Sequence, residues 1–380
     1  MKGIECIELR KFITEYKQKN EKNEFKPVAV GKYGIRTRES IYSKELAKDY
    51  SKNKIIFKNT LTVGMGSRQI DIGILTDDVI YSVSPAYHTY KISDINADYL
   101  RYCLMCRNED MFKRFVKRGS RQGKSIDLKR WLEYEIPVYD VCNQEKIVLK
   151  LNKVTNVISM RKQQLQKLDE LIQARFVELF GEPILNPKEW KIVTIGDIAL
   201  DVRYGTSRPA VEGGKYPYLR MNNLTIDGHL DLTDLKYIDI PEDELEKCVV
   251  RKGDILFNRT NSLELVGKTA VFDLCEDMVI AGYIIRVRLN NKMMLPEIFS
   301  QYMNHKTLKK ILRGMAKGAV NQANINAKEL QSIKIYVPNM KLQDEFVTFV
   351  NQVNKSKVEI QKALEKTQLL FDSLMQQYFG

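Results

Sequence analysis

Two stretches of the chain carry apolar residues at helical spacing and contain no proline. They are Gln144–Gly181 and Gln343–Gly380, and glycine occurs in each only at the end, where helices commonly stop. Residues three or four apart share one face of a helix, so each stretch predicts a long helix with one apolar seam. The seam positions are Ile147, Leu151, Val154, Ile158, Leu165, Leu168, Ile172 and Leu179, then Phe346, Val350, Val353, Ile360, Leu364, Phe371, Leu374 and Tyr378.

A seam sustained over this length favours a coiled coil in which the two helices bury their seams against each other. At about 1.5 Å per residue, each helix would run roughly 55 Å. Polar residues interrupt the seam at Arg161 and Arg175 in the first stretch, and at Lys357 and Thr367 in the second. The alternative is that each helix packs separately on its own domain.

The two halves of the chain repeat one another at a distance of 199 residues. This shift aligns the ends of the halves without a gap, and upstream it aligns Arg114 and Gly119 with Arg313 and Gly318. A period this long indicates the duplication of one plan, a mixed domain followed by a long helix. The residues that recur 199 positions later are Ile126, Lys129, Ile136, Val138, Gln144, Val148, Asn152, Val154, Leu165, Lys167, Leu171, Phe180 and Gly181.

Short β-rich runs separated by turns precede each long helix. In the second half, the predicted strands are Tyr216–Asn223, Val249–Asn258, Lys268–Phe272, Met278–Leu289 and Ser332–Val337, with a helix at Pro296–Leu312. In the first half, they are Pro27–Val30, Ile55–Phe57, Val79–Val83 and Leu132–Val138, with a helix at Ala97–Val116.

The predicted fold class is therefore α+β, with two mixed α/β domains separated by two long antiparallel coiled-coil helices in a pseudo-two-fold internal repeat. The expected parts are a first domain at residues 1–140, a first helix at 141–182, a second domain at 183–340 and a second helix at 341–380. A length of 380 residues fits more than one domain.

Composition adds a basic balance of charge. The net charge is +13, from 61 Lys and Arg against 48 Asp and Glu, which suits a polyanion such as nucleic acid or an anionic membrane. No run approaches 18 apolar residues, and Met1–Arg10 does not look like a signal peptide. Six scattered cysteines fit a reducing compartment, so we expect a cytoplasmic protein. Cys103 and Cys106, the one close pair, are interpreted as helix-packing residues rather than zinc ligands.

The segment between the small helix and the last strand of each half is rich in cations. Residues 112–130 hold eight Lys and Arg with one acid, Asp127, and residues 305–328 hold six with none. Lys and Arg suit phosphates, whereas Asn, Gln and Arg can read base edges. A solvated helix end is the alternative, but two such runs at equivalent places favour DNA contact. The candidates are Lys117, Arg118, Arg121, Gln122, Lys124, Lys317, Asn321 and Gln322.

Further polar clusters lie in predicted loops. In the second half they are Arg203, Tyr204, Thr206, Ser207 and Arg208, then Arg220, Asn222 and Asn223, then Asn258, Arg259, Thr260 and Asn261. The looser counterparts in the first half are Lys32, Arg36, Arg38, Arg68, Gln69 and Tyr87. These residue types contact DNA in many proteins, but Asn and Thr also form turns, so each cluster has that alternative role.

The motifs of several enzyme classes are missing from the sequence. No Pro-Pro pair occurs, which excludes the Asn/Asp-Pro-Pro-Tyr/Phe core of an amino-methyltransferase. Gly267-Lys268-Thr269 resembles the end of a phosphate-binding loop, but Ser262 stands where that loop requires glycine. His88, His229 and His305 form neither a metal spacing nor a triad pattern. We therefore predict no catalytic residue and no metal site in this chain.

Taken together, these motifs resemble those of the specificity subunits of Type I restriction-modification systems. The resemblance covers essentially the whole chain, but the first half resembles a different type of target-recognition domain, through Pro27–Ile35 and the shared end, and lacks the Gly-Asp-Ile-Leu element. In the second half, the similar segments are Tyr204–Ser207, Tyr216–Leu224, Lys252–Thr260, Val266–Lys268, Asn321–Ile325 with Leu330, Ile333–Pro338 and Gln343–Gly380.

The resemblance implies a role in recognition rather than catalysis. Each target-recognition domain would read one half of a bipartite double-stranded DNA site in the major groove, and the helices would set the gap between the half-sites. The helices would also dock two adenine methyltransferase subunits and, through them, restriction subunits. This chain would need no cofactor, whereas S-adenosylmethionine, ATP and Mg²⁺ would bind to the partner subunits. The predicted docking residues are Leu165, Leu171, Phe176, Phe180, Leu364, Leu370 and Phe379.

A different assembly remains open as an alternative. The chain could be the recognition half or the scaffold of another restriction or DNA-modification assembly. The internal duplication favours a reader of two DNA segments, because a pseudo-dimer presents two equivalent surfaces to DNA.

Overall fold

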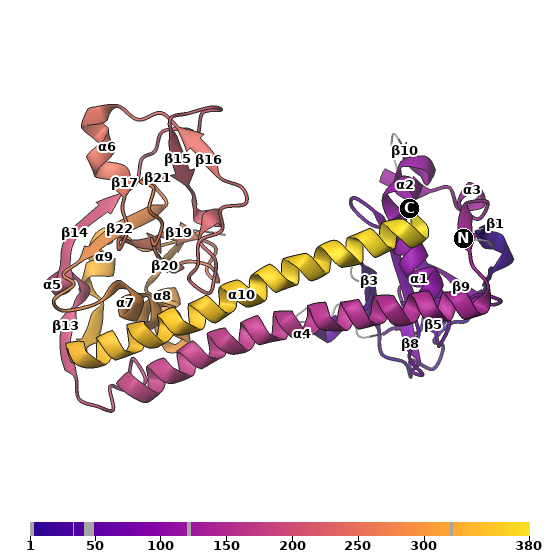
Figure 1. Ribbon diagram of the computed structural model, residues 1–380, viewed down its shortest axis with the longest axis horizontal. Helices are drawn as coiled ribbons and strands as arrows, with labels where there is room; N and C mark the ends of the chain where they lie inside the picture. The colour runs from indigo at the N-terminus through magenta and orange to yellow at the C-terminus, as the bar shows by residue number, and fades with distance from the viewer. Residues whose placement is uncertain (1–3, 33, 42–48, 120–122, 320–321) are drawn as a thin grey trace. The chain divides into compact units, whose positions relative to one another are not determined.

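The computed structural model describes residues 4–32, 34–41, 49–119, 123–319 and 322–380. Contacts divide the chain into two units. The first unit comprises Met1–Lys162 and Gln361–Gly380, and the second comprises Gln163–Ile360. Each unit contains small β-sheets, short helices and part of each of two long helices (Figure 1).

The first unit is built around a four-stranded antiparallel sheet in the order β2–β9–β6–β7. These strands are β2 (Ile13–Glu15), β9 (His88–Ile92), β6 (Thr60–Met65) and β7 (Ile70–Leu75). The paired strands are β1 (Glu5–Glu8) with β12 (Glu135–Val138), β3 (Val28–Gly31) with β4 (Gly34–Thr37), β5 (Lys54–Ile56) with β8 (Tyr81–Val83), and β10 (Val116–Gly119) with β11 (Gly123–Ile126). The short α-helices are α1 (Ala97–Cys106), α2 (Asn108–Phe115) and α3 (Leu128–Trp131).

The second unit contains two four-stranded sheets, in the orders β14–β22–β18–β20 and β16–β15–β21–β17. Their strands are β14 (Ala199–Tyr204), β22 (Ile284–Leu289), β18 (Ile255–Asn258), β20 (Thr269–Val271), β16 (Lys236–Ile238), β15 (Tyr216–Leu219), β21 (Met278–Ile280) and β17 (Val249–Val250). Smaller sheets join β19 (Thr260–Asn261), β24 (Gln322–Asn324) and β23 (Lys317–Ala319), and pair β13 (Lys191–Thr194) with β25 (Lys334–Val337). The short α-helices are α5 (Ile195–Ile198), α6 (Glu242–Cys248), α7 (Pro296–Asn304), α8 (Lys306–Met315) and α9 (Ala327–Ser332).

The duplication seen in the sequence is reproduced in the fold. The long helices α4 (Val141–Phe180) and α10 (Met340–Phe379) begin and end 199 residues apart, as do β12 and β25. In each unit a hairpin, a short helix and a strand lead into the long helix: β10–β11, α3 and β12 in the first unit, and β23–β24, α9 and β25 in the second. The predicted α+β fold class, with two β-rich domains and two long helices, is confirmed.

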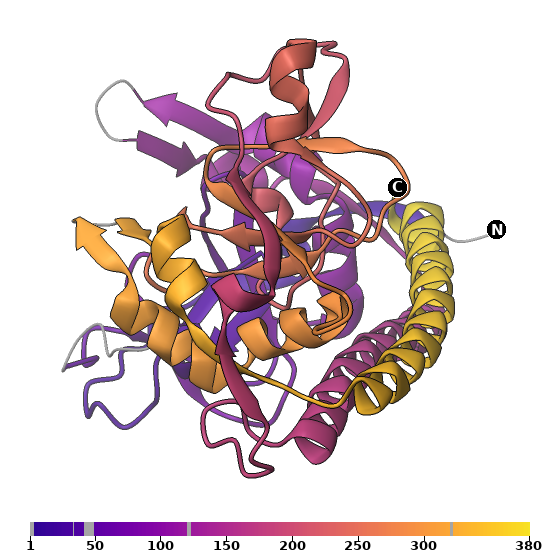
Figure 2. The same ribbon diagram turned by 90° about the vertical axis from the view of Figure 1, so that its left-hand side faces the viewer.

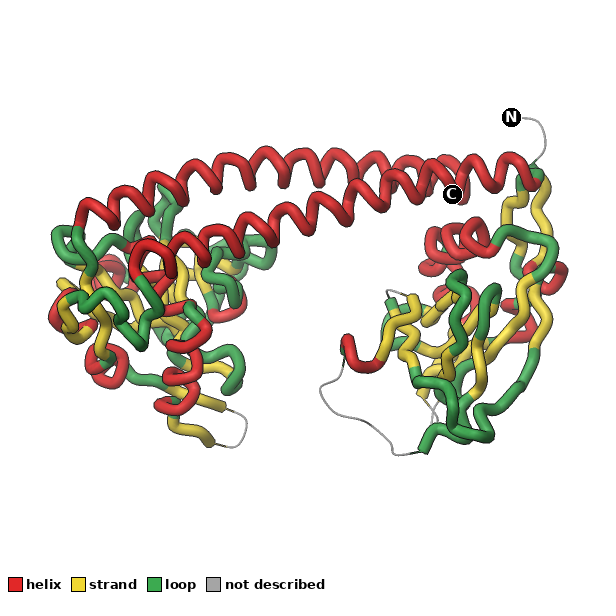
Figure 3. The backbone as a smooth tube through the Cα atoms, turned by 90° about the horizontal axis from the view of Figure 1, so that it is seen from below, coloured by secondary structure: helices red, strands yellow, loops and turns green. Residues whose placement is uncertain are grey.

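The long helices pack against each other within each unit (Figure 3, red). In the first unit, Leu151 of α4 shares a core with Phe371 and Phe379 of α10. In the second unit, the ring centroids of Phe176 in α4 and Phe346 in α10 lie 5.7 Å apart. The beginning of one helix therefore meets the end of the other in both units, and the pair is antiparallel as predicted. The same side chains also belong to the domain cores, so each helix packs on a domain as well as on the other helix, and the alternative of two separate helices is wrong.

The polar residues that interrupt the seam bind partners on the opposite helix. Within the first unit, Arg161 donates hydrogen bonds to the backbone oxygen of Ala363 and to the hydroxyl of Thr367. Within the second unit, the ammonium group of Lys357 lies 2.6 Å from a carboxylate oxygen of Asp169. A polar pair in an apolar seam is satisfied in one register only, so these contacts specify the alignment of the helices.

Two predicted helices are each divided in the structure. The helix expected at Ala97–Val116 breaks at Arg107, because the next residue, Asn108, binds the backbone of β7 through its side-chain amide. The helix expected at Pro296–Leu312 breaks at His305, whose extended backbone and ring nitrogen cap the beginning of α8. Local side-chain to backbone bonds of this kind compete with helix continuation.

A buried glutamine near the beginning of each long helix ties that helix to its domain. The side-chain oxygen of Gln144 accepts a hydrogen bond from the Asn96 N–H at 2.9 Å, and its nitrogen donates to the Tyr139 carbonyl at 2.7 Å. Gln343 makes the same two bonds with the residues 199 positions later, each at 2.9 Å. Both glutamines are almost fully buried. The duplication therefore extends to individual hydrogen bonds.

The substitution Gln343→Leu leaves the Leu295 N–H and the Pro338 carbonyl without their side-chain partner inside the core. We expect the free energy of unfolding to fall by about 2 kcal/mol, because a buried polar group without a partner costs roughly 1–3 kcal/mol. Urea denaturation measures the change. Gln352→Leu, on the exposed face of the same helix, is the matched control and should stay within about 0.5 kcal/mol of the wild type. Equal stability of the two variants would contradict the role of Gln343.

Candidate nucleic-acid interface

In the second unit, the end of β14 lies beside the connection between β18 and β19. The phenol oxygen of Tyr204 accepts a hydrogen bond from the Ala327 N–H at 2.8 Å. The guanidinium carbon of Arg259 lies 4.8 Å from the centroid of the Tyr204 ring, and Arg259 also donates to the Gly282 carbonyl at 3.2 Å. These contacts bring together segments from four separate parts of the chain.

The hairpin β23–β24 follows directly from α8 and extends this region (Figure 2, orange). Its strand β24 pairs with β19, and the Thr260 hydroxyl donates to the Asn324 side-chain oxygen at 2.9 Å. Lys317 and Gln322 lie on the hairpin strands, whereas Asn321 lies outside the described residues. We call the following segments the reading surface of the second unit: Arg203–Arg208, Asn258–Asn261 and the hairpin β23–β24.

Among the described side chains of the reading surface, four predicted ones are exposed: Arg203, Tyr204, Ser207 and Arg208. Arg208 makes two hydrogen bonds with the carboxylate of Glu244, at 2.8 and 3.0 Å. Arg203 binds the carboxylate of Asp201 at 2.8 Å. Exposed ion pairs of this kind contribute little to stability, so a phosphate group can replace the carboxylate with a small loss.

Other predicted residues of the second unit are engaged inside the fold. Asn223 and Asn258 are buried and donate to backbone carbonyls, which is the turn-forming alternative for these clusters. Asn261 is half-buried and donates to the side-chain oxygen of Asn258 at 2.9 Å. Asn222 remains exposed, and Arg220 binds Asp234 at 2.8 Å. The buried residues shape loops, so a ligand can meet only the exposed ones directly.

Thr206 is half-buried in the loop after β14, where its backbone pairs with Ala281 and its hydroxyl accepts the Arg208 N–H at 3.2 Å.

The adjacent Tyr283 was not predicted as part of the site. Its side chain is 51% exposed, and its carbonyl accepts the Arg259 N–H at 2.9 Å. Met278–Leu289 was predicted as one strand, but it turns between β21 and β22. The glycine before Tyr283 was the available signal, because glycine inside a strand pattern often marks a bend.

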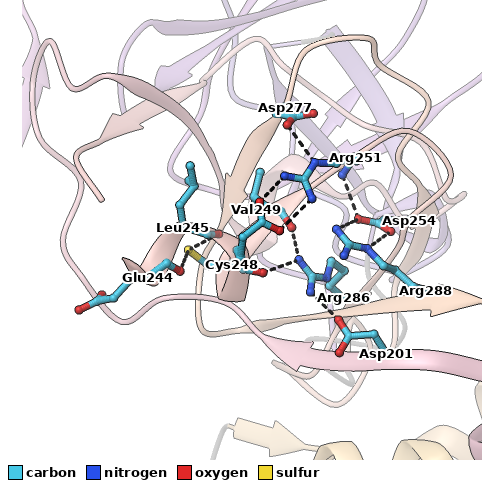
Figure 4. A network of polar contacts seen from close by, with 11 residues as sticks. Asp201, Glu244, Leu245, Cys248, Val249, Arg251, Asp254, Asp277, Arg286 and Arg288 are labelled. Atoms are coloured by element: carbon cyan, nitrogen blue, oxygen red, sulfur yellow. Dashed lines mark hydrogen bonds and ion pairs between the residues drawn. The ribbon is translucent and has the colours of Figure 1, made fainter. Parts of the chain in front are cut away.

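A buried arginine holds β14, the strand that carries the loop of Tyr204, in place (Figure 4). The side chain of Arg286 in β22 is fully buried, and it lies 2.5 Å from a carboxylate oxygen of Asp201 in β14. Arg286 also donates to the Val249 carbonyl. Asp201 therefore links the buried arginine to the exposed Arg203.

We expect Asp201→Asn to lower the free energy of unfolding by about 3 kcal/mol at pH 7, because it leaves the buried charge of Arg286 without its counter-ion. Burial alone would raise the pKa of Asp201, but hydrogen bonds from Arg203 and Arg286 lower it. A carboxylate with a lowered pKa contributes stability above its unfolded-state pKa and loses it as the pH falls through the folded-state pKa. The difference between wild type and variant should therefore shrink below about pH 4, as measured by urea denaturation.

The control for this prediction is Asp273→Asn, which changes an exposed aspartate of the same unit. Its stability should follow that of the wild type, within about 0.5 kcal/mol, at each pH. A difference between wild type and Asp201→Asn that stayed constant on acidification would show that the carboxylate charge is not what stabilises the strand.

In the first unit, the hairpin β10–β11 contacts the turn between β6 and β7. Lys124 donates a hydrogen bond to a backbone carbonyl in this turn, which also holds Arg68 and Gln69. Lys117 is exposed and lies 2.7 Å from the carboxylate of Asp127. The structure therefore places Lys124 against the turn that holds Arg68 and Gln69, and Lys117 lies on the same hairpin as Lys124.

The other residues predicted in the first unit belong to several elements. Arg118 is on β10, whereas Arg121 and Gln122 lie outside the described residues. Lys32 and Arg36, at the β3–β4 turn, line a cavity of about 970 Å³ whose wall includes Gln69. Two others contact neighbouring groups of the fold: Arg38 lies 5.3 Å from the centroid of the Tyr50 ring, and Tyr87 donates to the Val30 carbonyl at 2.9 Å.

The predicted docking residues of the long helices divide into two groups. Leu171 and Leu370 are 46% and 51% exposed, whereas Phe176, Phe180 and Phe379 are buried in the cores. Leu165 and Leu364 are half-buried. A fully buried side chain cannot contact a partner unless the core opens, so the exposed leucines are the ones that a partner can reach.

Within the described residues, no group of three or more His, Cys, Asp or Glu side chains is arranged to hold a metal ion. Cys103 is buried in the core of the first unit, and the thiol of Cys106 lies 3.6 Å from the Met375 carbonyl. This agrees with their interpretation as packing residues. No helix in the same part of the chain is long and apolar enough to cross a membrane.

The sequence profile of the family described as "Type I restriction modification DNA specificity domain" matches residues 7–170 and again residues 187–369. The chain belongs to this family. One match falls in each half of the duplication, so the specificity domain and the repeated structural plan coincide.

Two curated specificity subunits are similar to this specificity-domain protein. One is the type I restriction enzyme MjaX specificity subunit of Methanocaldococcus jannaschii, 29% identical over 187 residues, which are 47% of this chain and 44% of the relative. The other is the type I restriction enzyme EcoKI specificity subunit of Escherichia coli, 24% identical over 265 residues, which are 64% of this chain and 56% of the relative. The chain thus spans about half the length of the curated relatives it matches.

Two solved structures share the fold. The crystal structure of the S subunit of a Type I restriction-modification system from M. genitalium has a TM-score of 0.54 at 15% identity, covering 100% of this chain and 96% of the other. A chain from a structure of complex assembly and conformational transition in the type I system has a TM-score of 0.55 at 17% identity, covering 100% and 98%. Both likenesses support the fold described above.

Proposed function

We propose that this specificity-domain protein reads a bipartite DNA target within a Type I restriction-modification complex and performs no catalysis itself. The duplicated plan carries the proposal. The same hairpin, short helix and strand precede a long helix in each unit, and the family profile matches each copy once. Two equivalent readers on one chain fit two half-sites, as two-fold arrangements of DNA-binding proteins do.

Each reader combines groups suited to phosphates with groups suited to bases. On the reading surface of the second unit, Arg203 and Arg208 are exposed cations and Ser207 is an exposed uncharged group, and the adjacent Tyr283 is exposed as well. In the first unit, Lys117 and the turn at Arg68 and Gln69 supply the same mixture. Phosphate contacts fix the register on the duplex and base contacts distinguish sequences, so we assign one half-site to each unit.

We propose that two adenine methyltransferase subunits dock on the long helices and that restriction subunits join through them. Apolar side chains on both helices support this, since a partner would remove them from water. Exposed examples are Leu149, Met160, Leu171, Leu369 and Leu370, with exposed fractions of 57, 61, 46, 68 and 51%. S-adenosylmethionine, ATP and Mg²⁺ would bind to those partners, and the assembly would act on DNA in the cytoplasm.

The exchange of residues 190–338 for the corresponding segment of another family member tests the assignment of half-sites. We expect the chain, co-expressed with its methyltransferase subunits, to methylate a target in which one half-site has changed and the other half-site and the gap are unchanged. Long-read methylation mapping measures all three. Exchange of residues 1–139 is the reciprocal control and should change the other half-site. A change in both half-sites from one exchange, or methylation by the chain without partner subunits, would contradict the proposal.

The role of the long helices in setting the gap is tested by adding one heptad to each of them. The insertions follow Gln164 in α4 and Lys362 in α10, so the contacts of Arg161 with Ala363 and Thr367 and the pair of Lys357 with Asp169 stay intact. Seven residues lengthen a helix by about 10 Å, so we expect a gap longer by about three base pairs and unchanged half-sites. Insertion of five residues at the same places, which breaks the phase of the seam, is the control and should abolish methylation. Altered bases in either half-site would contradict the separate roles of helices and domains.

A further inference from the structure

One face of helix α8 is lined by cations. Residues spaced by three or four positions share one side of a helix, so these cations form a single row. The opposite side of the helix is apolar, and Leu308 and Leu312 on it are buried in the core of the second unit. The cations are Lys306, Lys309, Lys310 and Arg313.

This row lines a cavity of about 270 Å³ between α8 and the loop of residues 264–268, which we call the α8 pocket. Lys268 is a fifth cation that lines the pocket. It is buried, and its ammonium group donates to the carbonyls of Met221 at 2.7 Å and Leu224 at 2.5 Å. Glu264 is the one acid among the described residues that line the pocket. The pocket therefore has a strong excess of positive charge.

Lys309 is the half-buried cation of this row. Its ammonium group donates to the Gly267 carbonyl. Burial lowers the pKa of Lys309 to about 7, and the charges of Arg313 and Lys268 act in the same direction. A nearby anion favours the charged form of a lysine, so an anion in the pocket offsets the unfavourable gathering of cations.

The fold does not require this basic face. In the first unit, α2 occupies the position 199 residues earlier, and Asp110 stands where α8 has Lys309. There the cations are neutralised, because Lys113 binds Glu109 at 2.6 Å and Arg114 binds Asp110 at 2.8 Å. Among the residues that the structure describes, no acid forms an ion pair with the row on α8, so the row points to a ligand rather than to a structural role.

We propose that the α8 pocket binds the backbone phosphates of the duplex DNA that lies on the reading surface of the second unit. This inference rests on the proposed function. The pocket adjoins that surface through two short connections, since α8 leads into the hairpin β23–β24 and the loop of residues 264–268 follows β19. The row from Lys306 to Arg313 spans about 10 Å, which corresponds to about three base-pair steps along one strand. A free phosphate ion shares the chemistry, but it would not need a pocket next to the reading surface.

The double variant Lys306→Gln with Lys310→Gln tests the pocket in the complex with the methyltransferase subunits. Both side chains are exposed, so the fold should be retained. The dissociation constant for a duplex with the mapped target is measured over a series of salt concentrations. We expect roughly tenfold weaker binding and a salt dependence reduced by about 1.8 in the log–log slope, since each phosphate contact contributes about 0.9. The methylated sequence should be unchanged, because phosphate contacts carry no sequence information.

The matched control is Lys292→Gln with Lys341→Gln, which removes the same charge from exposed lysines elsewhere in the second unit. The proposal is overturned if the pocket variant keeps the wild-type slope, if the control reduces the slope equally, or if the pocket variant changes the methylated bases. A second measurement compares the Tm of the two proteins with and without inorganic phosphate at matched ionic strength. The proposal is also overturned if phosphate raises the Tm of the wild type but not of the pocket variant while both proteins show the same salt dependence of DNA binding. If the wild-type complex itself shows no specific binding, it is the proposed function that fails.

Discussion

The burial of one apolar stripe along each long helix is the constraint on which the rest of the structure depends. Most of the stability of helices in proteins comes from packing an apolar face rather than from helix propensity. Here that stripe is covered twice in each unit, by the other helix and by the domain. In the second unit, the rings of Phe176, Phe180 and Phe346 lie 5.2 to 5.7 Å from one another within the domain core. The pairing of the helices and the folding of each domain therefore stabilise one another.

Polar groups give this apolar arrangement a single alignment. Apolar seams alone tolerate a shift of the helices by a turn, because one apolar side chain can replace another. The pair of Lys357 with Asp169 and the bonds of Arg161 are lost in any other register. Gln144 and Gln343 fix the position of each long helix on its domain. If the helix moved along the domain, the buried backbone groups that these glutamines bind would lose their partners.

The long helices and the repeat were predictable from the sequence because their signals are periodic and sustained over many residues. The site was predictable only in part. Asn223 and Asn258 have the residue type of base-reading groups, but they are buried and bind backbone carbonyls, and composition does not separate these two uses of asparagine. The exposed turn at Tyr283 was not predicted because β21 and β22 form one largely apolar run in the sequence. The turn between them depends on the pairing of β21 with β15 and of β22 with β18. The four domain boundaries drawn from the sequence, and the base contacts themselves, stay predictions.

The division of the chain into units also bears on the order in which the protein can assemble during synthesis. The second unit is one continuous segment, Gln163–Ile360, whereas the first unit includes Gln361–Gly380. The core of the first unit lacks Phe371, Met375 and Phe379 until those residues have left the ribosome. Domains generally fold in order from the N-terminus during synthesis, but here the core of the second unit can be completed before that of the first. Until then, residues 1–162 expose the apolar face that the end of α10 later covers. Chaperones bind nascent chains that expose apolar surface of this kind.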